Sequence, residues 1–189
     1  MLLLIASDLH GSADALQAVL DRFAAEGAER ILWLGDLLYH GPRNDLPGGY
    51  RPKEVIAGLN ARRRELFCVR GNCEAEVDQM VLEFPVLADY ALLPLPGGRT
   101  IFATHGHHHN TATPPPLQPG DILLHGHTHL FAAEPFAVEG GECLYLNPGS
   151  VALPKGGNPP TCMTLDTTSG DWRLIGLDGC LLRAGNLLA

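Results

Sequence analysis

Five short apolar runs in this chain each end at a cluster of polar side chains that can bind metals. The runs have the length and composition of buried strands, and they cover Leu2–Ser7, Ile31–Leu34, Leu66–Arg70, Thr100–Thr104 and Asp121–His125. The clusters that follow them are Asp8-Leu9-His10, Gly35-Asp36, Gly71-Asn72, His105-Gly106-His107 and Gly126-His127-Thr128-His129. Because the ends of neighbouring strands can direct side chains into one pocket, the pattern predicts a sheet protein with a polar site at its strand ends.

The order of the expected elements changes half-way along the chain. In the first half, Ser12 is a typical helix N-cap, Gly27 a typical helix stop, and Pro52 suits the first turn of a second helix. A short helix is expected from Glu74 to about Leu82. In the second half, strand-like runs follow one another at Tyr90–Leu95, Thr100–Thr104, Ile122–His125, Cys143–Leu146, Cys162–Leu165 and Trp172–Leu177. This order predicts an α/β protein with two packed sheets flanked by helices.

Length and composition fit a single globular domain over residues 1–189. The formal net charge of −8 argues against a surface that coats nucleic acid, but it permits a small phosphate substrate. No run approaches the roughly 18 apolar residues of a membrane span, so no membrane association is expected. The five cysteines are an odd number without a Cys-x-x-Cys pair. We therefore expect reduced thiols and a cytoplasmic protein.

The ligand types in the clusters are carboxylate, imidazole and amide oxygen. This mixture suits hard to borderline divalent metals, and it differs from the thiolate ligands of a structural zinc site. Side chains two residues apart on a strand face the same way, so Asp8 can point with His10, and His127 with His129. Seven of the nine histidines fall between His105 and His129, which is too dense for random surface use. Glycines beside the ligands allow close backbone approach.

The order and spacing of these clusters resemble the calcineurin-like metallophosphoesterase superfamily. The shared motifs are Asp-x-His, Gly-Asp, Gly-Asn, a lone His, and Gly-His-x-His, and the resemblance runs from Ser7 to about Ser150. The segments 35–45, 70–80 and 146–159 look more specifically like the small bacterial phosphodiesterases of the YfcE type. The resemblance implies a four-layer α/β/β/α sandwich of two mixed sheets.

The same resemblance assigns the metal ligands. Two divalent ions about 3.5–4 Å apart are expected, with Mn²⁺ favoured and Zn²⁺, Fe²⁺, Co²⁺ or Ni²⁺ as alternatives. One ion is bound by Asp8, His10 and His129, the other by Asn72, His105 and His127, and Asp36 bridges both. The expected catalytic residues are Asp36, Asn72, Cys73 and His107.

The segment that follows Asp36 contains three candidates for substrate binding: His40, Arg43 and Asn44. Arginine offers planar donors to phosphate oxygens, although the segment could equally be an exposed Gly-Pro turn. Two supporting features are also expected. Glu74 either orients a ligand or starts a helix, and Asn147-Pro148-Gly149-Ser150 forms a turn behind the metal loops.

Most members of the superfamily have histidine where this chain has Cys73, and that histidine is thought to protonate the leaving group. The YfcE type shares the cysteine, which leaves the general acid open. We expect a phosphodiesterase in which a bimetal-activated hydroxide attacks phosphorus. The alternatives are a phosphomonoesterase on the same site, a metal-binding interaction scaffold, and a nucleotide sensor. The expected partner is a small phosphate ester, nucleotide-like esters included, and a homo-oligomer is left open.

Overall fold

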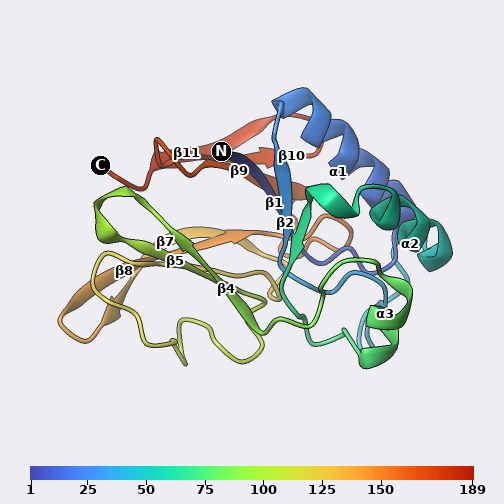
Figure 1. Ribbon diagram of the computed structural model, residues 1–189, viewed down its shortest axis with the longest axis horizontal. Helices are drawn as coiled ribbons and strands as arrows, with labels where there is room; N and C mark the ends of the chain where they lie inside the picture. The colour runs from blue at the N-terminus through green and yellow to red at the C-terminus, as the bar shows by residue number, and fades with distance from the viewer.

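The computed structural model describes residues 1–189 and contains two mixed β-sheets (Figure 1). The first sheet has six strands in the order β11-β10-β9-β1-β2-β3. Strands β1, β2 and β3 are parallel, whereas β9 is antiparallel to β1 and β10. In chain order these strands are β1 (Leu2–Ala6), β2 (Arg30–Trp33), β3 (Leu66–Cys68), β9 (Thr161–Asp166), β10 (Asp171–Gly176) and β11 (Leu181–Asn186).

The second sheet has five strands in the order β4-β5-β6-β8-β7. Strands β5, β6 and β8 are parallel, and the two edge strands are antiparallel to their neighbours. These strands are β4 (Tyr90–Pro94), β5 (Thr100–Thr104), β6 (Ile122–Leu124), β7 (Phe131–Val138) and β8 (Gly141–Pro148).

The α-helices all precede β4 in the chain: α1 (Ala13–Glu26), α2 (Pro52–Ala61) and α3 (Glu76–Val81). Two 3₁₀ turns, η1 (Arg63–Glu65) and η2 (Pro96–Gly98), complete the elements. The predicted start of α1 is confirmed, because the Ser12 hydroxyl accepts a hydrogen bond from Ala15 N (3.1 Å). Gly27 ends the helix in a left-handed conformation, and Pro52 opens α2 as expected.

Strand β1 contributes side chains to two hydrophobic cores. Leu4 and Ala6 belong to the core beneath α1 and α2, whereas Leu3 and Ile5 belong to the core shared with the second sheet. This alternation follows the two-residue repeat of extended backbone. A strand that is apolar on both faces is therefore buried on both faces, as the continuous apolar run of the sequence indicated.

The predicted α/β fold with two mixed sheets is confirmed, and two strands were missed. Strand β11 is exposed at every residue, so it lacks the alternation that marks a half-buried strand. Strand β7 contains Pro135, which argues against a strand unless it lies at a sheet edge, and β7 is an edge strand. The short helix α3 begins at Glu76, two residues later than predicted.

Candidate metal centre

The loops that follow β1, β2 and β6 are bonded to one another at the carboxyl ends of these strands. The N–H of Asp8 donates to Gly35 O (3.2 Å), and the N–H of His10 donates to Asp36 O (2.8 Å). The N–H of His127 donates to the Asp8 carboxylate (3.1 Å), which joins residues 119 positions apart. The three loops therefore form one polar unit.

Left-handed backbone occurs at five residues other than glycine, and all five are predicted metal ligands. Their φ angles lie between 48° and 66°, at Asp8, His10, Asp36, His127 and His129. Such backbone costs about 1–2 kcal/mol per residue, so the surroundings must hold it. The prediction that extended strand geometry aligns Asp8 with His10 is wrong, since β1 ends at Ala6. Turns, and not the strand repeat, direct these side chains inward.

Two glycines allow the loops to approach this closely. A Cβ at Gly126 would collide with the side chains of Ser7 and Asp8, and a Cβ at Gly71 would collide with the Asp36 carboxylate. Any other residue at either position would push a predicted ligand away. These positions bear out the expected use of glycine for close backbone approach.

Asp8, His10 and His129 form a buried cluster, which we name the inner group. His10 Nε2 lies 3.3 Å from His129 Nε2 and 3.7 Å from Asp8 Oδ1. His129 Nε2 lies 3.3 Å from the same Asp8 oxygen. All three residues are at most 3% exposed.

Asn72, His105 and His127 form a second cluster, the outer group. His105 Nε2 lies 3.0 Å from Asn72 Oδ1 and 3.1 Å from His127 Nδ1. Asp36 lies between the two groups, because its Oδ2 atom is 3.5 Å from His105 Nε2 and 3.7 Å from His10 Nε2. A bridging carboxylate requires this position.

Backbone carbonyls fix which ring nitrogen of three histidines carries the proton. Nδ1 of His10 lies 2.8 Å from Tyr39 O, Nδ1 of His105 2.6 Å from Leu34 O, and Nδ1 of His129 2.6 Å from Leu153 O. A carbonyl oxygen only accepts, so Nδ1 donates and Nε2 of the neutral ring keeps a lone pair. Lone pairs and acceptor oxygens therefore face one another across the site, which needs a cation at its centre.

The pKa values of the site residues also indicate that the site needs a cation. Burial alone would lower the pKa of His105, but its contact with Asp36 raises it to about 9. Burial alone would raise the pKa of Asp36, and the contact with His105 instead holds it well below its usual range. Burial lowers the pKa of His10 and of His127. His10 and His127 therefore favour the neutral form that binds metals, and His105 is held by the Asp36 charge.

The protein groups fit divalent metal ions. The ligand atoms of Asp8, His10 and His129 lie within 4.8 Å of one another, as do those of Asp8, Asp36 and His105. Asp8 Oδ1 is buried and accepts no aligned hydrogen bond from any protein donor. The carbonyl on the far nitrogen of each histidine is the support that metal-binding histidines typically have.

Glu74 fixes the backbone around Asp36. One of its oxygens accepts from the N–H groups of Asp36 (2.8 Å) and Gly71 (2.5 Å), and the other accepts from Leu37 N (2.6 Å). Burial and the Asp36 charge raise the pKa of Glu74 to about 7. Of the two expected roles, the structure supports the positioning one, because α3 begins only at Glu76.

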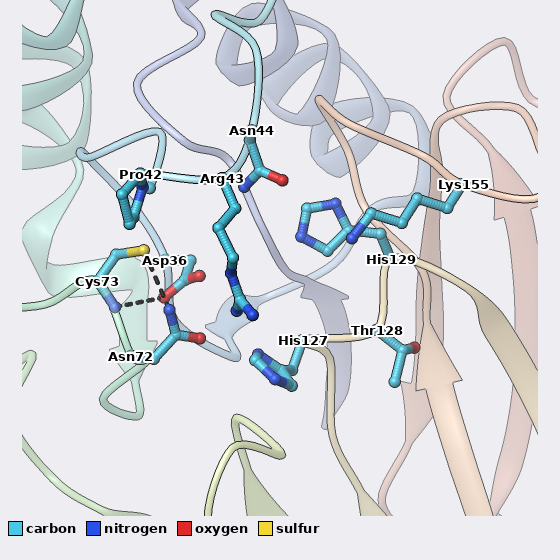
Figure 2. A pocket seen from close by; sticks show the side chains of 11 residues that line it. Asp36, Pro42, Arg43, Asn44, Asn72, Cys73, His127, Thr128, His129 and Lys155 are labelled. Atoms are coloured by element: carbon cyan, nitrogen blue, oxygen red, sulfur yellow. Dashed lines mark hydrogen bonds between the residues drawn. The ribbon is translucent and has the colours of Figure 1, made fainter.

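A polar cavity of about 480 Å³ opens beside these ligands (Figure 2). Its wall includes four predicted ligands and only two apolar side chains, those of Pro42 and Cys73. Figure 2 shows the Arg43 guanidinium pointing into the cavity toward Asn72 and His127. The complete lining is Asp36, Gly41, Pro42, Arg43, Asn44, Asn72, Cys73, His127, Thr128, His129 and Lys155.

The three predicted substrate-binding residues take different places. Arg43 and Asn44 line the cavity, whereas His40 does not. The His40 ring packs edge-on against Tyr39 and Tyr50, with ring centroids 4.7 and 5.4 Å away. Its backbone oxygen accepts from Asn44 Nδ2 (2.8 Å), so His40 shapes the loop that presents Asn44.

Cys73 and His107 line different cavities, and Asn72 borders both. The N–H of Cys73 donates to Asp36 Oδ1 (2.9 Å), and the Cys73 sulfur accepts from Asn72 Nδ2 (3.2 Å) (Figure 2). Burial and the Asp36 charge raise the pKa of this thiol far above its usual range. His107 lines a separate cavity of about 340 Å³ that Asn72 shares, and burial lowers the pKa of His107 to about 4.

Sequence reasoning missed Lys155, which lines the main cavity. It belongs to the loop after β8. The segment Asn147–Ser150 packs behind the metal loops as predicted, but its first two residues end β8 and do not form the expected turn. The Ser150 hydroxyl donates to Asp8 O (2.9 Å), and Asn147 Nδ2 donates to Gly126 O (2.9 Å). The family-like segment 146–159 was a signal for the loop, but no charge pattern singled out its lysine.

Comparison with known families agrees with this geometry. The family described as "Calcineurin-like phosphoesterase superfamily domain" matches residues 1–170. This chain belongs to that superfamily. Its sequence is 48% identical to Phosphodiesterase YfcE of Escherichia coli (strain K12) over 166 residues, which cover 88% of each chain. It is 30% identical to Probable metallophosphoesterase YsnB of Bacillus subtilis (strain 168), over 82% of this chain and 78% of the relative.

Solved structures show the same fold. The structure of Yfce, a phosphoesterase from E. coli, superimposes with a TM-score of 0.90 at 43% identity, and it covers 99% of this chain and 100% of its own. Vps29 from Entamoeba histolytica, solved with Zn²⁺, matches with a TM-score of 0.58 at 22% identity over 99% of each chain. The second likeness shows the fold alone. None of the helices is both long and apolar enough to span a membrane.

Proposed function

We propose that this member of the superfamily is a dinuclear metal-dependent phosphodiesterase. The observation that carries the proposal is the convergence of ring nitrogens and acceptor oxygens around Asp36, at the wall of a polar cavity. The inner group would hold one ion, the outer group the other, and Asp36 would bridge them. The relative named Phosphodiesterase YfcE, at 48% identity, supports the choice of a diester substrate.

The donor set favours Mn²⁺ over Mg²⁺, because it contains four imidazoles and Mn²⁺ accepts imidazole ligands more readily. The same donors also suit Zn²⁺, Fe²⁺, Co²⁺ and Ni²⁺. When bound, two such ions supply Lewis-acid polarisation of the phosphoryl group and activation of the attacking water.

The remaining groups of the cavity bind and orient the ester. Arg43 can donate two parallel hydrogen bonds to phosphate oxygens from its position beside Asn72 and His127. Cys73 is next to Asp36, but a thiol of raised pKa is a weak general acid, so esters with stable leaving groups should react fastest. The substrate would be a small phosphate ester, nucleotide-like esters included, and reduced thiols suit a cytoplasmic setting.

One observation favours a phosphomonoesterase as the second candidate. Arg43 and Lys155 both line the cavity, and two cations would suit the dianion of a monoester. A comparison of bis(p-nitrophenyl) phosphate with p-nitrophenyl phosphate separates the two activities.

The test is turnover by protein that has been stripped with a chelator and reconstituted with single metals. We expect no hydrolysis by stripped protein, recovery with Mn²⁺ that exceeds recovery with Mg²⁺, and a higher kcat/KM for the diester. Metal analysis should give about two ions per chain. Full hydrolysis after exhaustive chelation, or metal-loaded protein that hydrolyses neither ester, contradicts the proposal.

A further inference from the structure

Two cationic side chains line the cavity without an acidic partner. Arg51 and Arg62, elsewhere on the surface, pair with carboxylates 2.7–2.9 Å away. Arg43 and Lys155 make no such pair and extend toward the cavity from opposite walls (Figure 2). In a chain of net charge −8, two unpaired cations in one cavity indicate that its ligand carries the missing negative charge.

The backbone of Lys155 is fixed against the inner group. Its N–H donates to His129 O (3.1 Å), while the ring of the same histidine donates to Leu153 O (2.6 Å). Leu153 N in turn donates to the Ser150 hydroxyl (2.9 Å), which donates to Asp8 O (2.9 Å). The backbone of Lys155 is thus tied directly to His129 and, through Leu153 and Ser150, to Asp8, so its side chain starts from a fixed point on the cavity wall.

The two cations face different parts of any ester bound at the ligands. Figure 2 shows Arg43 beside Asn72 and His127, where the reacting phosphate would lie, and Lys155 on the side of His129 and Thr128. Apart from imidazoles, the cavity wall contains no aromatic ring, and Pro42 and Cys73 are its only apolar side chains. The wall around Lys155 therefore suits a charged substituent better than an aromatic or aliphatic one.

We propose that Lys155 is a specificity-determining residue, which binds a second anionic group carried by one of the two alcohols of the diester. This inference rests on the proposed function. Arg43 takes the phosphoryl oxygens, and the compact ammonium of Lys155 donates to a carboxylate or phosphate on the alcohol. The preferred substrate class is then a diester with an additional negative charge close to the scissile phosphate.

The experiment compares two diesters of equal size and identical leaving group: p-nitrophenyl 2-carboxyethyl phosphate and p-nitrophenyl 3-methylbutyl phosphate. We expect the Mn²⁺-loaded protein to prefer the carboxylate ester by about tenfold in kcat/KM, chiefly through KM, the size of one charge-assisted hydrogen bond. K155M should bring the ratio close to one, and K155R should keep most of it. K53M is the matched control, because Lys53 is the only other lysine and lies outside the cavity.

Calorimetry decides the inference without turnover. Wild-type protein, Mn²⁺-loaded or chelator-treated, is titrated with 2-carboxyethylphosphonate and with propylphosphonate, and ethane-1,2-diphosphonate tests a phosphate-like arm. A preference for either probe with a second anionic group that K155M removes supports the role of Lys155, even if no diester is hydrolysed and the proposed function fails. Equal binding of the probes with and without the second anionic group, or a preference that K155M leaves intact, overturns it while leaving the proposed function standing.

Discussion

The inner and outer groups contain similar donors but are built differently. Asp8, His10 and His129 are buried, and all three have left-handed backbone. In the outer group only His127 has such backbone, Asn72 is exposed, and both of these residues line the cavity. Strained, buried backbone thus prepares the inner group in advance, and of its members only His129 reaches the cavity. In the outer group His105 is buried, and the other two members meet solvent and substrate. Asp36 belongs to both groups, which makes it the first residue with which to test the distinction.

Asp36→Asn should have the largest effect, because it removes one of the two carboxylate charges and weakens both groups together. We expect a loss of at least about 100-fold in kcat, comparable to the removal of a major electrostatic stabiliser. Steady-state kinetics and metal analysis measure it, with Asp45→Asn on the exposed part of the same loop as control. Near-native activity with both ions bound would show that Asp36 is not the bridge.

Cys73→His tests whether chemistry takes place on the outer side. An imidazolium at this position could protonate a departing alkoxide, so alkyl diesters should gain about 100-fold while p-nitrophenyl diesters gain little. The measurement is a plot of log rate against leaving-group pKa for both proteins, and the variant should give the flatter line. Parallel lines would mean that position 73 does not face the leaving group.

Arg43→Ala addresses substrate binding over the outer group. If Arg43 contacts an oxygen that is already charged in the ground state, KM should rise about tenfold and kcat should fall less. Arg64→Ala, an exposed arginine outside the cavity, is the control. Unchanged kinetic constants would return Arg43 to an ordinary turn residue, and an equal fall in kcat and kcat/KM would place it on transition-state charge.

His10→Ala and His127→Ala should separate the groups by stability. Each should lower the metal content by about one ion per chain, since each removes a ligand. His10 is buried, so its loss also leaves a cavity and leaves the buried Asp8 without one of its polar neighbours. We therefore expect the melting temperature of His10→Ala to fall about 5 °C further than that of His127→Ala. Calorimetric melting of metal-loaded proteins checks this. Equal melting temperatures would contradict the view that the inner group is the structural one.

The sequence predicted the strands β1, β2, β5 and β6, because a run that is buried on both faces must be apolar throughout. It could not predict β11, whose residues are all exposed and carry no burial pattern. The sequence also predicted the type of site, because few kinds of site other than a metal site require carboxylates and histidines directly after buried strands. The placement of Arg43 in the cavity and of His40 behind it could not be read, because adjacent loop residues have no fixed direction.

What the sequence by itself determined was the list of candidate ligands and the order of strands that carry them, because both depend on residue type and local spacing. The tertiary structure alone decided how those ligands meet. Left-handed turns at Asp8 and His129 replaced the expected strand alternation, and only packing between distant loops can hold such backbone. The tertiary structure also placed Lys155 beside His129, through a hydrogen bond from the backbone N–H of Lys155. Any residue except proline could donate this bond, so the sequence does not reveal it. Local pattern therefore fixed the chemistry, and long-range backbone bonding fixed its geometry.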